Sequence, residues 1–158
     1  LAVAHEAIDS GLYDTLQFPF CYLCSEKDVE LVEDCKKNNI GFIAMKALSG
    51  GLITNSAAAY AFEGQYDNVL PIWGVQRENE LDEFLSYMEH PPVMNDEIRA
   101  LIEADRKQLY GSFCRGCGYC MPCPAGIEIN NCARMSLRRP SVPRGPGKDD
   151  EDQGLPPL

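Results

Sequence analysis

The sequence is short of positive charge and of long apolar runs. It has 14 Lys and Arg residues against 24 Asp and Glu residues, which gives a formal net charge of -10. Nucleic acids and anionic membranes bind clustered basic side chains, so this balance argues against either one as the main partner. No apolar run approaches the roughly 20 residues that a membrane-spanning helix needs. We therefore predict no nucleic-acid partner and no membrane partner.

The chain also opens without a basic stretch followed by an apolar one, so a secretory leader is not indicated. The first residue is Leu1, from which we expect a fragment or a processed product. Eight cysteines would suit a secreted disulfide scaffold, but a leaderless chain with a packed cysteine loop points to a reducing, cytoplasmic location. With 158 residues, 45% of them hydrophobic, the chain can form one modest domain plus an appendage.

A dense cysteine segment is the strongest feature that the sequence does have. It reads FCRGCGYCMPCPAGIEIN, with two residues between successive cysteines and a proline after the last one. The run resembles the ferredoxin-type pattern that wraps one 4Fe–4S cubane, although that pattern has one more residue before its last cysteine. Gly116 and Gly118 would let the backbone approach a cluster closely. We predict a 4Fe–4S cluster held by Cys114, Cys117, Cys120 and Cys123.

Two alternatives remain open for this segment. A structural zinc site also uses four cysteines, though it usually pairs two CxxC knuckles from separate parts of a chain. Disulfides or free thiols are the other alternative. At the fourth corner of a cubane, Cys132 competes with Cys123. We favour Cys123 because Pro124 turns the chain away directly after it, and because a longer loop costs more ordering entropy.

Strand-like and helix-like stretches alternate ahead of the cysteine segment. Apolar, β-branched and aromatic residues predict strands at 13–20, 40–48 and 69–75. Helices are predicted at 1–11, 26–39, 54–62 and 78–88, and from Asn95 onward. Ser25 and Asp28 form a capping box for the second of these helices. The alternation has the roughly 30-residue period of βα units, so we predict an α/β fold with about three of them.

Apolar spacing further predicts which side chains are buried. Residues 40–48 are apolar enough for both faces of the strand to be covered, as in a parallel sheet. Cys35 falls on the apolar face of its helix and should belong to the core. One side of the helix at 78–88 is expected to face inward; it consists of Leu81, Phe84, Leu85 and Met88.

Three of these stretches carry a family resemblance: QFPFCYL, GFIAMKALSGGLI and PIWGVQRENELDEFL. They resemble the sixth, seventh and eighth barrel strands of aldo/keto reductases, in the subgroup with a C-terminal 4Fe–4S segment. The resemblance implies the C-terminal part of a TIM-type (β/α)8 barrel at residues 1–110 and a cluster-binding segment at 111–137. For residues 138–158, rich in Pro, Gly and charge, we expect a disordered tail.

The same resemblance implies an activity: nicotinamide-dependent redox of a carbonyl-type substrate, with NAD(P) and a 4Fe–4S cluster as cofactors. An electron-transfer partner would suit the cluster. The Asp, Tyr, Lys and His with which the family reduces carbonyls have no counterpart here, so we assign no catalytic residue and expect this fragment alone to be inactive. The alternative is a non-enzymatic electron-transfer module, or a structural module stapled by 4Fe–4S or zinc.

By resemblance, the first cofactor contacts lie on the sixth and seventh strands. Gln17 matches the residue that hydrogen-bonds the nicotinamide carboxamide, and Met45 stands where the family often has a stacking aromatic. Ser49, Gly50 and Gly51 match the loop at the pyrophosphate, where backbone N–H groups can meet a phosphate. The residues alone leave open a buried Gln17 satisfied by backbone, and an ordinary turn at 49–51.

Further contacts are implied after the eighth strand. Gly74, Val75, Gln76 and Arg77 match the loop around the adenosine phosphate. Glu80 stands where NADP-preferring members often have Arg, and its negative charge would repel a 2′-phosphate. NADP preference is therefore not assumed, and the choice between NAD and NADP stays open.

The remaining chemically active residues have weaker assignments. Lys46 is expected to be polar lining or a cofactor contact. Cys21 and Cys24 form a CxxC that could be a redox pair, but small-residue packing is favoured for them. His5 and His90 are expected on the surface, without an acid, base or ligand partner.

Overall fold

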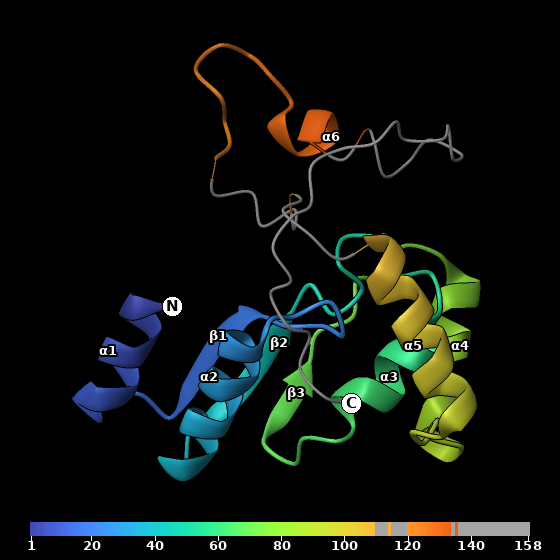
Figure 1. The fold of residues 1–158 in the computed structure, drawn as a ribbon, viewed down its shortest axis with the longest axis horizontal. Coiled ribbons are helices and arrows are strands. Elements are labelled where there is room, and N and C mark those ends of the chain that lie inside the picture. The colour runs from blue at the N-terminus through green and yellow to red at the C-terminus, as the bar shows by residue number, and fades with distance from the viewer. Residues whose placement is uncertain (110–113, 115–119, 134, 136–158) are drawn as a thin grey trace.

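The computed structural model describes residues 1–109, 114, 120–133 and 135. The tail predicted at 138–158 and the predicted ligand Cys117 lie outside these residues. The fold is α/β, as predicted, and Figure 1 shows its helices around a small sheet. Its elements in chain order are α1 (Ala2–Ser10), β1 (Thr15–Pro19), α2 (Glu26–Lys37), β2 (Gly41–Met45), α3 (Ser56–Glu63), β3 (Val69–Pro71), α4 (Glu78–Glu89), α5 (Asp96–Leu109) and α6 (Ile129–Ala133).

The three strands form one parallel sheet in the order β1-β2-β3. Thr15 pairs with Gly41 at one end of the β1–β2 register, and Pro19 pairs with Met45 at the other. A helix follows each strand, so the chain returns to the same end of the sheet each time, as the βα alternation predicts. All three strands therefore present their carboxyl ends at one edge of the sheet.

Each outer strand ends at a proline that faces away from the sheet. The N–H of Phe20 donates to Met45 at 3.0 Å and the N–H of Ile72 donates to Ala44 at 2.9 Å, so even-numbered residues of β1 and β3 bond the central strand. Pro19 and Pro71 consequently point outward, where a further strand would need an N–H that proline lacks. β3 is shorter than the strand predicted at 69–75, and it ends at this proline.

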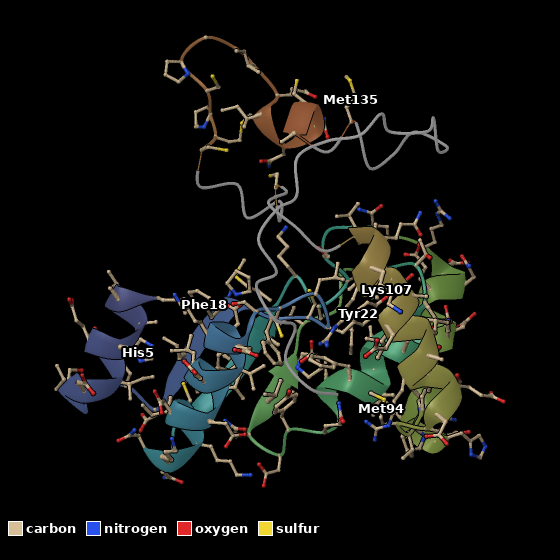
Figure 2. The ribbon with its side chains drawn as sticks, in the orientation of Figure 1. His5, Phe18, Tyr22, Met94, Lys107 and Met135 are labelled. Carbon is tan, nitrogen blue, oxygen red and sulfur yellow. The ribbon has the colours of Figure 1, made fainter. Side chains whose placement is uncertain are left out.

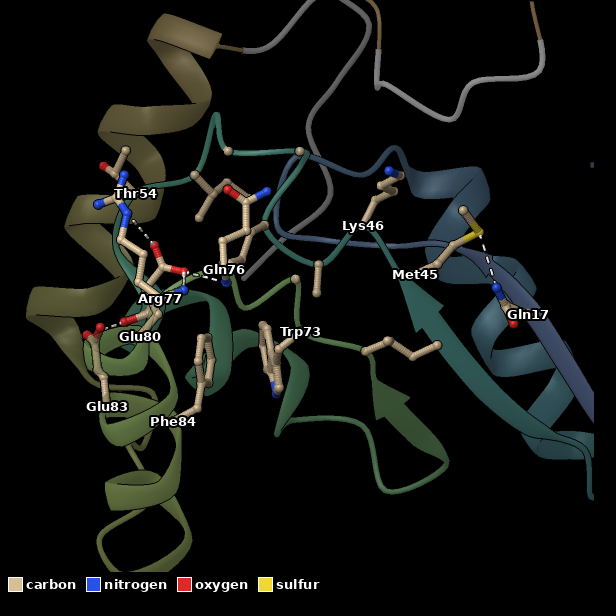
Figure 3. A pocket seen from close by; sticks show the side chains of 18 residues that line it. Gln17, Met45, Lys46, Thr54, Trp73, Gln76, Arg77, Glu80, Glu83 and Phe84 are labelled. Atoms are coloured by element: carbon tan, nitrogen blue, oxygen red, sulfur yellow. Dashed lines mark hydrogen bonds and ion pairs between the residues drawn. The ribbon is translucent and has the colours of Figure 1, made fainter. Parts of the chain in front are cut away.

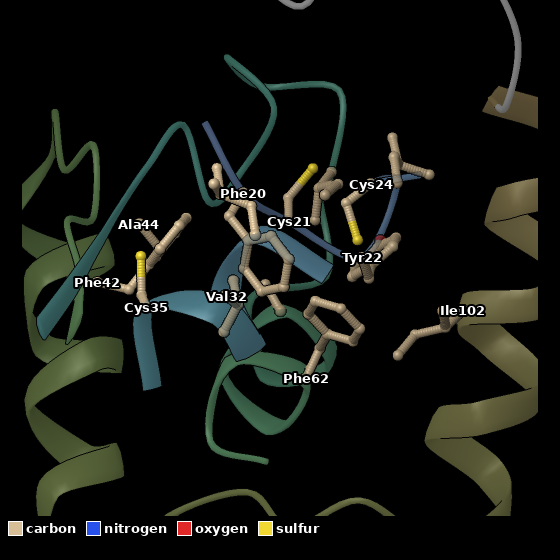
Figure 4. Packing of buried hydrophobic residues seen from close by; sticks show 14 of the residues in the cluster. Phe20, Cys21, Tyr22, Cys24, Val32, Cys35, Phe42, Ala44, Phe62 and Ile102 are labelled. Carbon is tan, nitrogen blue, oxygen red and sulfur yellow. The ribbon is translucent and has the colours of Figure 1, made fainter. Parts of the chain in front are cut away.

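The core lies between the sheet, α2, α3 and α5 (Figure 4). Its centre is a group of aromatic rings: Phe20 lies 5.6 Å from Phe42, 5.5 Å from Phe62 and 5.3 Å from Tyr66 between ring centroids. The pairs with Phe42 and Tyr66 are edge-to-face, an arrangement that stabilises a core beyond the apolar area that it buries. Cys35 is fully buried beside them, as predicted.

Helix starts follow the short-range signals in the sequence. The Asp28 carboxylate accepts the backbone N–H of Ser25 at 2.8 Å and its hydroxyl at 2.9 Å, so the capping residues of α2 meet as predicted. Asn95 Oδ1 accepts the N–H of Ile98 at 2.8 Å and caps α5, also as predicted. Such bonds satisfy N–H groups that the first helical turn leaves without intrahelical partners.

A clasp fixes α5 to the loop after β1. The hydroxyl of Tyr22 donates to Asp105 at 2.5 Å, and Nε of Arg106 donates to the Tyr22 carbonyl at 2.6 Å. The Arg106 guanidinium lies 6.0 Å from the centroid of Phe62, within cation–π range. Figure 2 shows Tyr22 beside α5, the helix that precedes the cysteine segment in the sequence. No helix in the described ranges combines the length and apolarity of a membrane span.

Two burial expectations were wrong. β2 has one covered face: Phe42 and Ala44 are buried, whereas Ile43 is only half-buried. Three of the four residues expected to face inward from α4 are exposed: Leu81 at 47%, Leu85 at 50% and Met88 at 77%. The sheet has no fourth described strand beyond β3, so no described layer covers that side of α4.

His5 also departs from its prediction, because it has an acidic partner. Its Nδ1 lies 3.5 Å from a carboxylate oxygen of Asp34, which links α1 to α2, while both side chains stay partly exposed. His90 is exposed, as expected.

Candidate functional site

A cavity of about 900 Å³ lies at the carboxyl ends of the three strands (Figure 3). This volume suits a small-molecule site, and parallel sheets place their ligands at this end. Seven of the nine predicted cofactor residues line it: Gln17, Met45, Gly50, Gly51, Gly74, Gln76 and Arg77. The other two, Ser49 and Val75, are not among its lining residues. Lys46, which was predicted to be polar lining or a cofactor contact, also lines the cavity.

Gln17 and Met45 meet at one end of the cavity. The Gln17 amide nitrogen donates to the Met45 sulfur at 3.7 Å, across adjacent strands. Gln17 is exposed, so the alternative of a buried glutamine satisfied by backbone is wrong. Its amide bonds only a weak sulfur acceptor among the described atoms, and a carboxamide of a ligand would be a stronger partner.

The loop after β2 has an unusual backbone. Lys46, Ser49, Gly50 and Gly51 all have positive φ angles, of 60°, 48°, 62° and 85°. Glycine adopts such angles freely, whereas Lys46 and Ser49 do so at a cost that functional sites often carry. Within this loop the N–H of Ser49 donates to Lys46 at 2.6 Å and that of Gly51 to Leu48 at 2.9 Å. These two N–H groups would have to leave their turn partners to bind a phosphate.

Glu80 lies at the opposite end of the cavity (Figure 3). Its carboxylate accepts the backbone N–H of Gln76 at 2.8 Å and that of Arg77 at 3.2 Å. Nε of Arg77 lies 3.9 Å from the same carboxylate. An anion thus already occupies the donors at the start of α4, where the resemblance puts the adenosine phosphate.

An aromatic wall that sequence reasoning missed closes one side of the cavity. Trp73 stacks on Phe84 with centroids 4.7 Å apart and on Tyr60 with centroids 5.9 Å apart. Tyr87 adds its edge to Phe84 and shares Glu83 with Ser56, which donates to that carboxylate at 2.5 Å. These contacts join α3 and α4 to the segment after β3. The single tryptophan in PIWGVQ was the available signal, but its partners are remote in sequence.

The CxxC at Cys21 and Cys24 is buried in the core rather than at the cavity. The two side chains are 5% and 0% exposed. Burial, followed by the neighbouring Cys21, raises the pKa of the Cys24 thiol far above its usual value. Redox cysteines need an accessible thiolate, so this environment favours the packing role.

Two of the predicted ligands in the cysteine segment share one hydrogen-bond acceptor, the side-chain amide oxygen of Asn130. The thiols of Cys114 and Cys120 both donate to Oδ1 of Asn130, at 3.4 Å and 3.6 Å. Cys123 is half-buried, and its competitor Cys132 is exposed on α6. Groups of three or more metal-ligating side chains are not found among the residues that the structure describes, which do not include Cys117. Soft thiols at this density remain the donor set that iron–sulfur clusters and zinc take.

No family model, curated protein or solved structure matched the chain in three comparisons.

Proposed function

We propose that the chain is the C-terminal part of an iron–sulfur oxidoreductase of the aldo/keto reductase type, whose sheet belongs to a TIM-type (β/α)8 barrel. Its cavity takes a nicotinamide cofactor beside a small carbonyl-type substrate. The cysteine segment takes a 4Fe–4S cluster that exchanges single electrons with a partner. The observation that carries this proposal is the convergence of seven cofactor residues, assigned from sequence alone, on one cavity at the strand ends.

The side chains of the cavity suit the parts of that cofactor. Gln17 offers an amide donor and acceptor for the nicotinamide carboxamide, and Met45 offers a polarizable surface for the ring. Lys46 and Arg77 supply positive charge for the pyrophosphate between them. A bound nicotinamide would supply hydride transfer, while the residues of this chain bind and orient it.

Trp73 makes a direct binding test possible, because it is the chain's single tryptophan and lines the cavity. We expect NADH to quench its fluorescence saturably. Gln17→Ala should weaken NADH binding about tenfold, since it removes a hydrogen bond and leaves the carboxamide unpaired. Gln108→Ala, an exposed glutamine on α5, is the matched control and should bind as wild type. An absence of saturable quenching, or equal affinities in both variants, would refute the cofactor assignment.

A non-enzymatic metal module is the second candidate, favoured by the gathering of Cys114 and Cys120 on Asn130. Anaerobic reconstitution with iron and sulfide separates a cluster from zinc. A cluster gives a brown protein with broad visible absorption that bleaches on reduction, whereas a zinc protein stays colourless. If the cluster forms but NADH does not bind, the electron-transfer module replaces the enzyme as the better account.

The fourth ligand can be tested in the same preparation. Cys123→Ser and Cys132→Ser each remove one candidate thiol, and iron and sulfide content reports occupancy. We expect Cys123→Ser to lose cluster and Cys132→Ser to keep it, because Pro124 redirects the chain after Cys123. Full occupancy in Cys123→Ser together with loss in Cys132→Ser would assign the corner to Cys132.

A further inference from the structure

Asn130 occupies a position that neither the cysteine spacing nor the family resemblance assigns. It lies in α6, half-buried, and its amide oxygen is the common acceptor for the thiols of Cys114 and Cys120. These two cysteines lie 16 and 10 residues before it in the chain, so the three side chains are brought together by folding and not by local sequence. Asn130 therefore touches the predicted ligand set directly.

The neighbouring asparagine shows that this contact depends on the face of the helix. The side-chain amide of Asn131 donates to the Glu128 carboxylate at 2.5 Å, and Asn131 is exposed. Successive helical residues point about 100° apart, so only one of the two asparagines can face the thiols. Asn130 and Asn131 thus have the same side chain and lie in the same helix, but they have different hydrogen-bond partners.

We propose that Asn130 hydrogen-bonds the ligand sulfurs of the 4Fe–4S cluster and thereby raises its reduction potential. The inference rests on the cluster assignment in the proposed function. An asparagine amide presents an oxygen on one side and an NH₂ on the other, and a half-turn about its last torsion exchanges them. Toward thiols the oxygen accepts, as the structure shows. Toward deprotonated, metal-bound sulfur the NH₂ donates.

The direction of the effect follows from charge. Reduction adds one electron to the cluster, and hydrogen bonds to the sulfurs stabilise that added negative charge. The donor amide of Asn130 consequently favours the reduced state. The proton stays on the amide throughout, and the electron comes from the mediator in a titration or from the partner protein.

The test is a set of midpoint potentials measured on the full chain after anaerobic reconstitution. Asn130→Ala should lower the potential, because the donor is lost. Asn130→Asp should lower it further, because an ionised carboxylate donates no hydrogen bond and adds negative charge beside the cluster. Asn131→Ala is the matched control and should keep the wild-type potential. Iron and sulfide content is measured on every variant, so that loading and tuning are separated.

The outcomes distinguish this inference from the function on which it rests. A wild-type chain that takes up no iron would overturn the cluster itself, and the role of Asn130 with it. A loaded Asn130→Ala variant with the wild-type potential would overturn only the role of Asn130. Complete loss of iron from Asn130→Ala, with full loading of Asn131→Ala, would also overturn it, because Asn130 would then be needed for assembly and not for tuning.

Discussion

Glu63 places an ionisable carboxyl group in the interior of the protein. It ends α3 only 2% exposed, and neither carboxylate oxygen has a hydrogen-bond partner among the described atoms. Burial raises the pKa of this carboxyl well above its usual value. Burial is the main cause that raises the pKa values of Cys24 and Tyr66, and the ionised Glu63 carboxylate raises them further. The positive charge of Arg106 acts on the same two groups and lowers their pKa values.

This environment predicts a pH dependence of stability. The unfolded chain ionises Glu63 near pH 4, whereas the folded protein holds it protonated to higher pH, so its contribution to stability falls as pH rises above about 4. Glu63→Gln should remove that fall in the free energy of unfolding. Glu63→Met should add about 1–3 kcal/mol at pH 7, because a buried oxygen without a partner costs that much. Urea unfolding at several pH values measures both, with exposed Glu30→Gln as the control. If the stability of Glu63→Gln has the same pH dependence as that of the wild type, the raised pKa of the buried Glu63 carboxyl is contradicted.

Glu80 predicts a test of cofactor choice. Its carboxylate accepts the Gln76 and Arg77 N–H groups, at the place where the proposed function puts the adenosine end of the cofactor. If that proposal holds, the negative charge should make the chain prefer NADH to NADPH. Glu80→Arg should shift the affinity ratio toward NADPH on the order of tenfold. Glu80→Gln separates charge from capping, because its oxygen can still accept those N–H groups. Fluorescence titration with both cofactors gives the ratio, and an unchanged ratio in Glu80→Arg would count against this position.

Residue-scale prediction worked where the signal was local. Ser25 meets Asp28, and Asn95 meets the N–H of Ile98, because a cap and its partner are three residues apart. The burial of Glu63 was not predictable, since α3 packs against α5 and Glu63 lies near Cys24 of the β1–α2 loop, both far along the chain. The same holds for the aromatic wall at Trp73, which joins segments that periodicity treats separately.

At the scale of elements, α4 shows what periodicity can and cannot predict. Of the four apolar residues predicted to face inward, only Phe84 packs against the aromatic wall. Hydrophobic periodicity says which residues share a side and not whether another layer covers that side. With β3 at the end of the described sheet, Leu85 and Met88 line a second, apolar cavity of about 380 Å³.

That exposed face predicts association of the chain with itself. The outward prolines Pro19 and Pro71 protect the sheet edges, so the contacts should come from apolar side chains and not from added strands. Leu85→Glu with Met88→Glu should shift light scattering and size-exclusion chromatography toward the monomer. Leu12→Glu, on a leucine between α1 and β1 that is 79% exposed, is the control and should leave association unchanged. Association that persists in the double variant would place the contact elsewhere.

At the scale of the molecule, the strand order explains why residues on separate strands line one cavity. Residues matched on separate strands converge because parallel strands bring their carboxyl ends to one edge. Ser49 does not line the cavity: its backbone has a positive φ angle and its side chain is buried, which strand patterns do not specify. Val75 is exposed and also does not line the cavity.

The side chains that line the cavity also bear on whether this chain alone can reduce a carbonyl group. Its ionisable lining consists of Lys46, Arg77, Glu80 and Glu83, and both carboxylates already accept hydrogen bonds from neighbouring groups. No tyrosine or histidine lines this cavity in the described part of the chain, so no phenol or imidazole stands ready to give the developing alkoxide its proton. Loss of such a general acid costs about 10²–10⁴-fold in rate.

We therefore expect NADH to bind without measurable carbonyl reduction. Turnover is followed at the NADH absorbance with an aromatic aldehyde, and binding by Trp73 fluorescence in the same sample. Lys46 is the remaining ammonium acid near the strand ends, so any turnover that is found should disappear in Lys46→Met if that amine delivers the proton. Turnover that survives Lys46→Met would mean that this chain carries a proton donor outside the cavity described.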